Sequence, residues 1–374
     1  MKISYRHIKL LLILTLLFIA RFSVAQSTVA IGGTVRDDKG ETLPGVTVFL
    51  SGTKAITAAD NNGKFTLNNI APGSYTLTAR FIGFQTFTQA VAVTKDVTLD
   101  VKLLPSVNQL SEVKITAYSE EYFQKFRQYF LGTTLNADKC GILNKDVLHF
   151  HFNKATNTLT VTADDFLEIE NKALGYKIKY LLQSFQLNDD EKLLSYQGQA
   201  SFAELKPETP KEAKTWKENR QIAYQGSIYH FLKSIYLNKL DKDGYAVYSI
   251  RNKTKPGETD DGKGIRPSRR PLKADSLMKM IDGDFKSFNH SQSIFVVYTI
   301  YEAEGYSNTD SEYNVKMTTK WNTFPKGQYS MLNFLAPEIV VDKHGYYSPP
   351  NALALEGHMG WEQIADLNPL EYGN

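Results

Sequence analysis

Apolar and polar residues alternate along residues 28–104, and this alternation restricts the fold of the chain more than any other sequence feature. A period of two residues is typical of strands that bury one face. Turn sequences, among them Asp60–Gly63 and Ala71–Gly73, interrupt the alternation about every 8–12 residues, as they do in all-β domains. About seven short strands fit into this stretch, which predicts an all-β Greek-key sandwich.

Several motifs in the same stretch resemble the carboxypeptidase-regulatory-like domain, with turns and strands in matching order. The residues that carry the resemblance are Gly33–Val35, Gly40, Leu43–Val48, Asp60, Gly63–Phe65, Pro72–Tyr75 and Phe81–Phe84. This family has a transthyretin-like (prealbumin-like) fold and also occurs at the front of many TonB-dependent outer-membrane receptors of Gram-negative bacteria. In metallocarboxypeptidases the sandwich is an accessory to the peptidase, so the resemblance implies a module without catalytic residues.

The sequence lacks the zinc motifs of the peptidases to which such sandwiches are attached. Zinc carboxypeptidases require His-x-x-Glu with a distant histidine, and other zinc peptidases use His-Glu-x-x-His. No histidine after residue 25 has a glutamate three residues later; these are His149, His151, His230, His290, His344 and His358. His149 and His151 lie on the same face of an expected strand and could bind zinc or copper, but the sequence indicates no third ligand for such a metal site. We therefore expect no metal and no cofactor.

Residues 1–25 have the organisation of a secretory signal. A basic start precedes an apolar run over residues 10–20, and Ser23 and Ala25 supply the small residues of a cleavage site. The apolar run is too short to span a bilayer comfortably, although an uncleaved anchor is the alternative. We expect export, with residence in the periplasm or at the outer membrane.

The charge of the chain after the signal argues against nucleic acid as a partner. Residues 1–25 hold four of the 43 basic residues, which leaves 39 basic against 40 acidic residues. The basic surface that nucleic-acid binding requires is therefore absent.

Cys140 is the single cysteine, so no internal disulfide can form and the chain depends on core burial.

Helical periodicity begins near residue 119 and marks a second region. Strand-like runs there mix with helical segments, the clearest being Lys211–Tyr224, Ser227–Leu240 and Trp361–Leu367, which predicts an α+β domain. This region is similar to exported proteins that carry the same sandwich and have no assigned activity. The expected organisation is a signal peptide at 1–25, the sandwich at 27–105, a linker at 106–118 and the α+β domain at 119–374, with a mobile loop at 252–273.

A candidate ligand site lies in the two central helical segments. Trp216, Arg220 and Tyr224 are spaced i, i+4, i+8 and share one helix face, so they could hold a glycan or peptide by stacking and forked hydrogen bonds. Ser227 and His230 follow within mutual reach. The alternative is that Ser227 N-caps the second helix and Trp216 packs on a sheet.

The sequence predicts a non-catalytic, exported binding or structural protein of the cell envelope. The sandwich would act as a docking or spacer module, and an envelope protein, a peptide or a glycan would be the partner. One alternative is an envelope hydrolase of the peptidase type that uses Ser227 as nucleophile and His230 as base. A second alternative is an accessory subunit of a TonB-dependent uptake system. The sequence defines neither the ligand nor the oligomeric state.

Overall fold

The computed structural model describes residues 28–106, 120–190, 193–251, 266–268, 270–300, 327–349 and 351–373. The predicted signal peptide, residues 107–118 of the predicted linker and residues 252–265 of the predicted loop lie outside these ranges. Within the described ranges, no helix is both long enough and apolar enough to cross a membrane.

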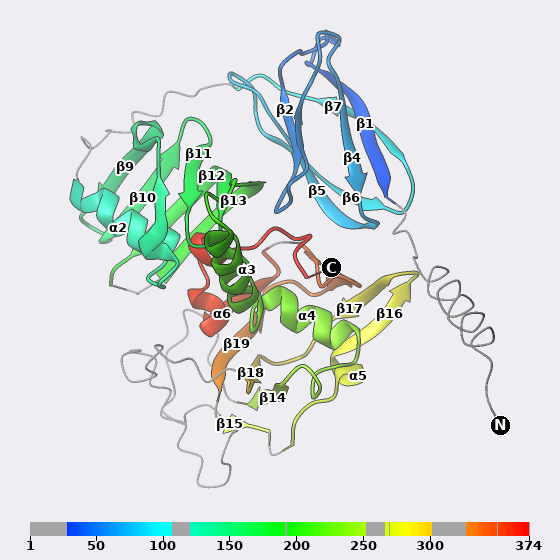
Figure 1. The fold of residues 1–374 in the computed structure, drawn as a ribbon, viewed down its shortest axis with the longest axis vertical. Coiled ribbons are helices and arrows are strands. Elements are labelled where there is room, and N and C mark those ends of the chain that lie inside the picture. Colours follow the sequence, from blue (N-terminus) through cyan, green and yellow to red (C-terminus); the bar gives the residue numbers. More distant parts are fainter. Residues whose placement is uncertain are drawn as a thin grey trace, which may run out of the picture.

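Two sheets face each other in the N-terminal part, which confirms the predicted β-sandwich (Figure 1). One sheet has the order β4-β1-β7 and the other the order β3-β2-β5-β6. The β1–β7 pair is parallel, and the other pairs are antiparallel. The strands are β1 (Val29–Arg36), β2 (Thr47–Leu50), β3 (Ile56–Ala58), β4 (Lys64–Ile70), β5 (Gly73–Arg80), β6 (Phe87–Val93) and β7 (Val97–Lys102).

Alternating side chains of these strands form the sandwich core. In β4, Phe65 and Leu67 are buried while Thr66 between them is exposed, as the pleat of a half-buried strand requires. The close approach of β1 and β7 depends on Gly33, since a Cβ atom there would lie 1.8 Å from the carbonyl oxygen of Leu99. Only glycine fits this position without moving the backbone.

A sheet built around the long β12–β13 hairpin opens the second region. Along one edge β12 pairs with β13, and along the other it pairs with both β11 and β10. Helix α2 buries Phe126 and Phe130 against this sheet. The elements are α2 (Glu120–Leu131), β8 (Cys140–Ile142), β9 (Leu148–Asn153), β10 (Thr158–Ala163), β11 (Leu167–Asn171), β12 (Tyr176–Asn188) and β13 (Leu193–Glu204).

Helices α3 (Pro210–Tyr224) and α4 (Ile228–Tyr236) lead into two further sheets, of order β15-β14-β18-β19-β22 and β16-β17-β20-β21. Together these helices and sheets confirm the predicted α+β region. The remaining elements are β14 (Tyr245–Arg251), β15 (Arg266–Pro267), α5 (Ala274–Leu277), β16 (Met278–Asp282), β17 (Phe285–Phe288), β18 (Ile294–Tyr298), β19 (Gln328–Phe334), β20 (Ile339–Asp342), β21 (Tyr347–Ser348), β22 (Leu353–Gly357) and α6 (His358–Trp361).

Three local predictions were wrong at their boundaries. The helix expected at Ser227–Leu240 ends at Tyr236, because the chain leaves the helical conformation and Asn238 takes a φ of 55°. The helix expected at Trp361–Leu367 is α6 followed, after two extended residues, by a 3₁₀ turn at Ile364–Asp366. In the loop expected at 252–273, Arg266–Pro267 pairs with β14.

The second region contains two large apolar cores. One is formed mainly by α2 and the β8–β13 sheet, and the other by α4 and the strands that follow it. The tail after α6 returns to the first core, where Ile364 and Ala365 are fully buried. We call the parts of the chain that form these two cores the two bodies. The tail follows the second body in the sequence and packs into the core of the first, so it connects them.

The sandwich contacts β13 and the tail through the main chain of one loop, Ser51–Lys54, which we call the junction loop. Gly52 donates its N–H to the carbonyl of Ala200 in β13 at 2.7 Å, and the N–H of Leu370 in the tail donates to the Gly52 carbonyl at 2.8 Å. Phe202 donates its N–H to the next carbonyl of the loop at 2.9 Å. The loop therefore lies beside β13 like a short added strand.

Buried aromatic side chains extend the contact. Phe49 of β2 packs edge-on against Phe166, with ring centroids 5.7 Å apart, and these two residues cluster with Leu181. Tyr346 inserts into the sandwich core and lies 5.8 Å from the ring of Tyr75. The sandwich is thus built into the rest of the described chain rather than attached by a linker alone.

Replacing Phe49 with alanine should destabilise the protein by about 3–5 kcal/mol, since a fully buried ring at the contact would leave a cavity. Chemical denaturation measures the change. The control is Phe81→Ala, in a partly exposed loop of the sandwich, which should cost clearly less. Equal losses for the two variants would show that the contact adds no stability.

Candidate functional site

Helix α3 binds the turn between β11 and β12 through four consecutive carbonyl groups. Trp216 Nε1 donates to Lys172 O at 2.9 Å and Asn219 Nδ2 donates to Ala173 O at 2.8 Å. Arg220 donates from Nε to Leu174 O at 2.6 Å and from Nη2 to Gly175 O at 3.1 Å. Two residues of the predicted stripe, Trp216 and Arg220, therefore bind backbone carbonyls of a tight turn together with Asn219.

The guanidinium of Arg220 is enclosed on its other sides as well. It stacks over the ring of Tyr176, 4.0 Å from the centroid, and its Nη1 lies 3.3 Å from Glu204 Oε2. Trp216 is only 6% exposed. In this arrangement neither side chain presents a free stacking face, in contrast to the glycan or peptide role considered from the sequence.

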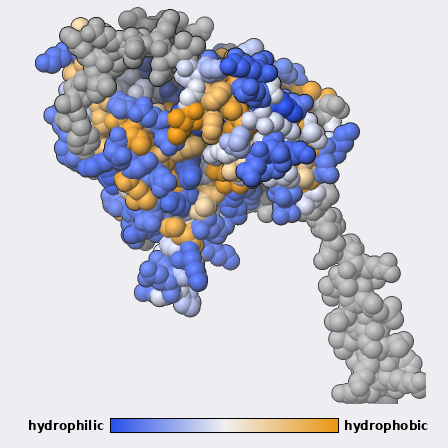
Figure 2. Space-filling view, turned by 90° about the horizontal axis from the view of Figure 1, so that it is seen from above, coloured by the Kyte–Doolittle hydropathy of each residue, from blue (hydrophilic) through white to orange (hydrophobic). Residues whose placement is uncertain are grey.

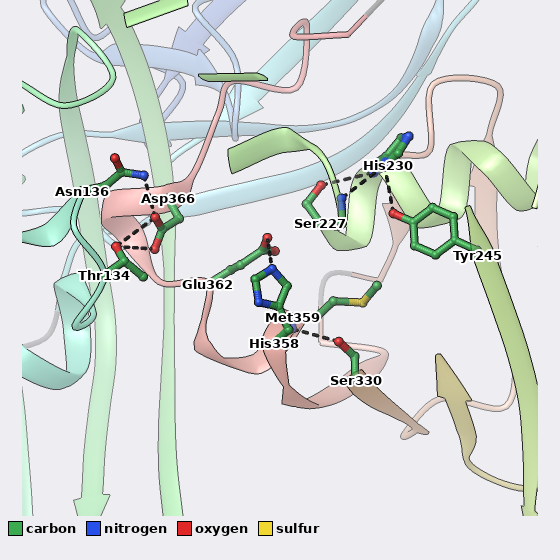
Figure 3. A network of polar contacts seen from close by, with 11 residues as sticks. Thr134, Asn136, Ser227, His230, Tyr245, Ser330, His358, Met359, Glu362 and Asp366 are labelled. Carbon is green, nitrogen blue, oxygen red and sulfur yellow. Dashed lines mark hydrogen bonds and ion pairs between the residues drawn. The ribbon is translucent and has the colours of Figure 1, made fainter. Parts of the chain in front are cut away.

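Ser227 and His230 lie close together but are joined through the main chain (Figure 3). The Ser227 hydroxyl accepts the backbone N–H of His230 at 3.3 Å and so N-caps α4. The His230 ring turns elsewhere: its Nδ1 accepts the N–H of Gly226 at 3.2 Å and lies 2.9 Å from the Tyr245 hydroxyl. Burial lowers the pKa of His230, which favours the neutral imidazole.

A cavity of about 210 Å³ lies where the tail, α4 and β13 meet. Of the five residues nominated from the sequence, Tyr224 and Ser227 line this cavity, whereas Trp216, Arg220 and His230 do not. Most of the wall comes from residues after 343 that the sequence did not nominate. We call this space the central cavity and take it as the candidate site.

Tyrosines dominate the wall of the central cavity. Two of them form an edge-to-face pair, Tyr224 and Tyr372, with ring centroids 5.5 Å apart. Burial raises the pKa of Tyr224 and of Tyr229 to about 12, so these phenols stay neutral near pH 7. The lining tyrosines are Tyr196, Tyr224, Tyr229, Tyr346, Tyr347 and Tyr372.

Two carboxyl groups share the same wall (Figure 3). Asp366, in the tail, accepts hydrogen bonds from Thr134 Oγ1 at 3.0 Å and from Asn136 Nδ2 at 2.9 Å. Burial raises its pKa to about 6 despite these donors. Burial first, and then the nearby Asp366 charge, raise the pKa of Glu362 well above its usual range.

His358 Nε2 lies 3.8 Å from Glu362 Oε1. Burial lowers the pKa of His358 to about 4, so its imidazole is neutral near pH 7, and burial raises the pKa of Glu362. The contact is therefore not an ion pair, and the shifted pKa values mark the cavity as a candidate functional site.

Other chemistry-bearing residues are placed away from this cavity. His149 Nε2 lies 2.6 Å from Asp164 Oδ2, and His149 and His151 oppose threonines of β10. In the part of the chain that the structure describes, no three His, Cys, Asp or Glu side chains are grouped to hold a metal ion. Burial raises the pKa of Cys140 to about 12, which keeps it a thiol near pH 7.

The acidic residues of the cavity left a weak signal in the sequence. Glu362 and Asp366 are four residues apart, and Ile364 and Ala365 between them are fully buried. Two charges placed in a segment with apolar neighbours are candidates for burial. Because the other walls come from distant segments, the sequence does not show that these carboxyls share a cavity.

Comparisons with known proteins identify the sandwich. Residues 31–115, in the N-terminal region, match the CarboxypepD_reg-like domain. This regulatory-type module confirms the resemblance predicted from the turns and strands.

A 113-residue stretch is 34% identical to TonB-dependent receptor P39 of Formosa agariphila. It covers 29% of this chain but only 10% of the receptor, so the similarity reaches a small part of that protein.

Solved structures give weaker similarity. A cohesin–X-dockerin complex of Acetivibrio cellulolyticus shares 21% identity over 28% of this chain and 77% of that chain, with a TM-score of 0.20. The minor pilin of Streptococcus agalactiae shares 17% identity over 22% of this chain and 46% of that chain, with a TM-score of 0.18. At these scores the two structures carry no argument about function.

The Arg220→Lys variant should lose about 1–3 kcal/mol of stability, because an ammonium cannot donate to both turn carbonyls and stack on Tyr176. Thermal or chemical denaturation measures the loss. Lys214→Arg, an exposed change on the same helix, should shift stability by no more than about 0.5 kcal/mol. Wild-type stability in the Arg220→Lys variant would mean that the guanidinium is free for another role.

The two carboxyls should make stability fall as the pH rises. Since the folded-state pKa of Asp366 is about 6 against an ordinary 3.8, the unfolded state ionises first and stability is lost between these values. The loss amounts to about 3 kcal/mol, at about 1.4 kcal/mol for each unit. Glu362 adds a loss of the same sign that begins near its ordinary value of 4.5.

Glu362→Gln isolates this effect, because the difference between variant and wild type cancels the titration of other groups. Relative to wild type, the variant should gain stability as the pH rises above about 4.5 in denaturation series, because the wild-type carboxyl loses stability in that direction. Glu218→Gln, at a 59% exposed side chain of α3, should give a flat difference. A flat difference for Glu362→Gln would contradict the raised pKa.

Proposed function

We propose that this protein is an exported, non-catalytic binding or structural protein of the cell envelope, in which the sandwich is a rigid docking module. The observation that carries the proposal is the junction loop. Its main-chain hydrogen bonds to β13 and to the tail fix the sandwich on the rest of the described chain, because these bonds need defined directions between donor and acceptor. A sandwich held in a fixed position suits a docking role, in which it presents its surface to a partner, better than the role of a flexible spacer.

The sandwich keeps features suited to docking at two strand edges and at one end. In the described residues β6 pairs only with β5, and β7 pairs only with β1, so each has one edge available for an added strand. At the end of the sandwich, Ile82 is 76% exposed and Leu104 is 47% exposed. The loop of Ile82 is tied to the segment of Leu104, since Gln85 N donates to Leu104 O at 2.8 Å.

Exposed apolar groups of this kind are set among hydrophilic surface on the molecule (Figure 2). Scattered apolar residues are normal on soluble proteins, but a pair beside open strand edges favours a protein partner. An envelope protein is therefore the partner that we propose for the sandwich.

The family match supports this assignment and also favours one specific role. Because part of the chain is similar to a TonB-dependent receptor, an accessory subunit of a TonB-dependent uptake system is the second candidate. The hydrolase alternative has less support, since the Ser227 hydroxyl caps a helix and is bonded to main chain. No contact between that hydroxyl and the His230 ring supports a nucleophile and base here.

A pull-down from native envelope membranes, followed by mass spectrometry, tests the docking role. Wild type should capture a defined envelope protein, and Ile82→Asp should reduce capture about tenfold, because a charge would be desolvated at the contact. The matched control is Ile222→Asp, the same change at a 43% exposed position outside the sandwich, which should leave capture unchanged. Equal capture by both variants would exclude the sandwich end as the docking surface, and recovery of an outer-membrane receptor would favour the accessory role.

A further inference from the structure

The central cavity contains two carboxyl groups that no lysine or arginine of its described lining faces. Glu362 and Asp366 both line it, and the lining residues include no lysine or arginine within the described chain. Asp366 is bonded to the neutral groups of Thr134 and Asn136, and Glu362 faces the imidazole of His358, which burial keeps neutral. Ionised acids in protein interiors are usually paired with a cation, so these two carboxyls would be stabilised in their ionised forms by a cation placed in the cavity.

Two further polar atoms of the wall lack partners. His344 Nε2 and Asn368 Oδ1 are buried and make no hydrogen bond within the described residues. Both residues line the central cavity. Orphan polar atoms of this kind indicate a bound group, because a buried donor or acceptor left unpaired costs about 1–3 kcal/mol. The amide oxygen of Asn368 is an acceptor and therefore favours a ligand that carries N–H donors.

The size and the aromatic wall restrict the ligand further. The cavity volume of about 210 Å³ exceeds the roughly 150 Å³ that accommodates benzene in an engineered protein cavity, but it is too small for a peptide or glycan chain. Tyrosine rings attract organic cations through their π faces, and quaternary ammonium groups are recognised by such aromatic walls. Leu355 and Met359 add apolar surface that suits carbon substituents on the cation.

We propose that the central cavity binds one small organic ammonium ion, with Glu362 and Asp366 as its counter-charges and the tyrosines as its aromatic wall. The proposal rests on the proposed binding role of the protein, for which it names a ligand class. Burial raises the pKa of both carboxyls, and a bound cation would act in the opposite direction by favouring their ionised forms. The ligand would thus occupy the junction of the tail with α4 and β13.

Isothermal titration of the purified full chain tests the proposal with four probes. Tetramethylammonium and ethylammonium represent the ligand class, tert-butanol is the neutral control of similar size, and potassium is the inorganic control. We expect saturable 1:1 binding of at least one ammonium ion and none of tert-butanol or potassium. Absence of saturable ammonium binding, or equal binding of either control, would overturn the proposal without requiring any variant.

Variants then locate the site. Glu362→Gln should weaken ammonium binding at least about tenfold, and Asp366→Asn should weaken it as well, because each removes one counter-charge. Glu218→Gln should leave the affinity unchanged within about twofold. Unchanged affinity in folded Glu362→Gln and Asp366→Asn would place binding elsewhere. Because the membrane pull-down uses the sandwich end, it can succeed when ammonium binding fails, which separates the two proposals.

Discussion

The main-chain hydrogen bonds of the junction loop are the constraint on which the rest of this structure depends. A backbone amide and carbonyl can be satisfied only along fixed directions, and Gly52 uses both of its groups across the contact, one toward Ala200 and one from Leu370. The loop thereby sets the position of β13 and of the tail at once. The central cavity forms between these two segments, so its shape follows from that pair of bonds.

The same junction explains why acidic side chains are tolerated inside. The tail carries Asp366 into the first core beside Ile364 and Ala365, where Thr134 and Asn136 meet it. Apolar neighbours anchor the tail, and the carboxyls follow because they flank these anchors in the sequence. The burial of hydrophobic side chains thus offsets the desolvation of the charges. A cation in the cavity would reduce that cost, which connects the stability of the junction to the proposed ligand.

The sandwich could be predicted from the sequence because its information is local. Turn residues such as Gly63 and alternating residues such as Phe65 and Leu67 sit within one hairpin of each other. The N-cap of α4 by Ser227 was likewise readable as an alternative, since it requires only neighbouring residues. Trp216 and Arg220 could not be assigned, because the carbonyls that they bind belong to a turn more than 40 positions earlier. The cavity was missed for the same reason: its walls come from segments that the fold alone brings together.

The position of Leu370 in the chain has a consequence for how the molecule is made. Synthesis proceeds from the N-terminus, so the sandwich and the β13 strand emerge long before the residue that closes the junction between them. Until Leu370 arrives, one face of the junction loop and the rings around the cavity remain uncovered. The nascent chain therefore passes through a stage in which this surface needs shielding from other chains, and completion of the tail ends that exposure in a single step.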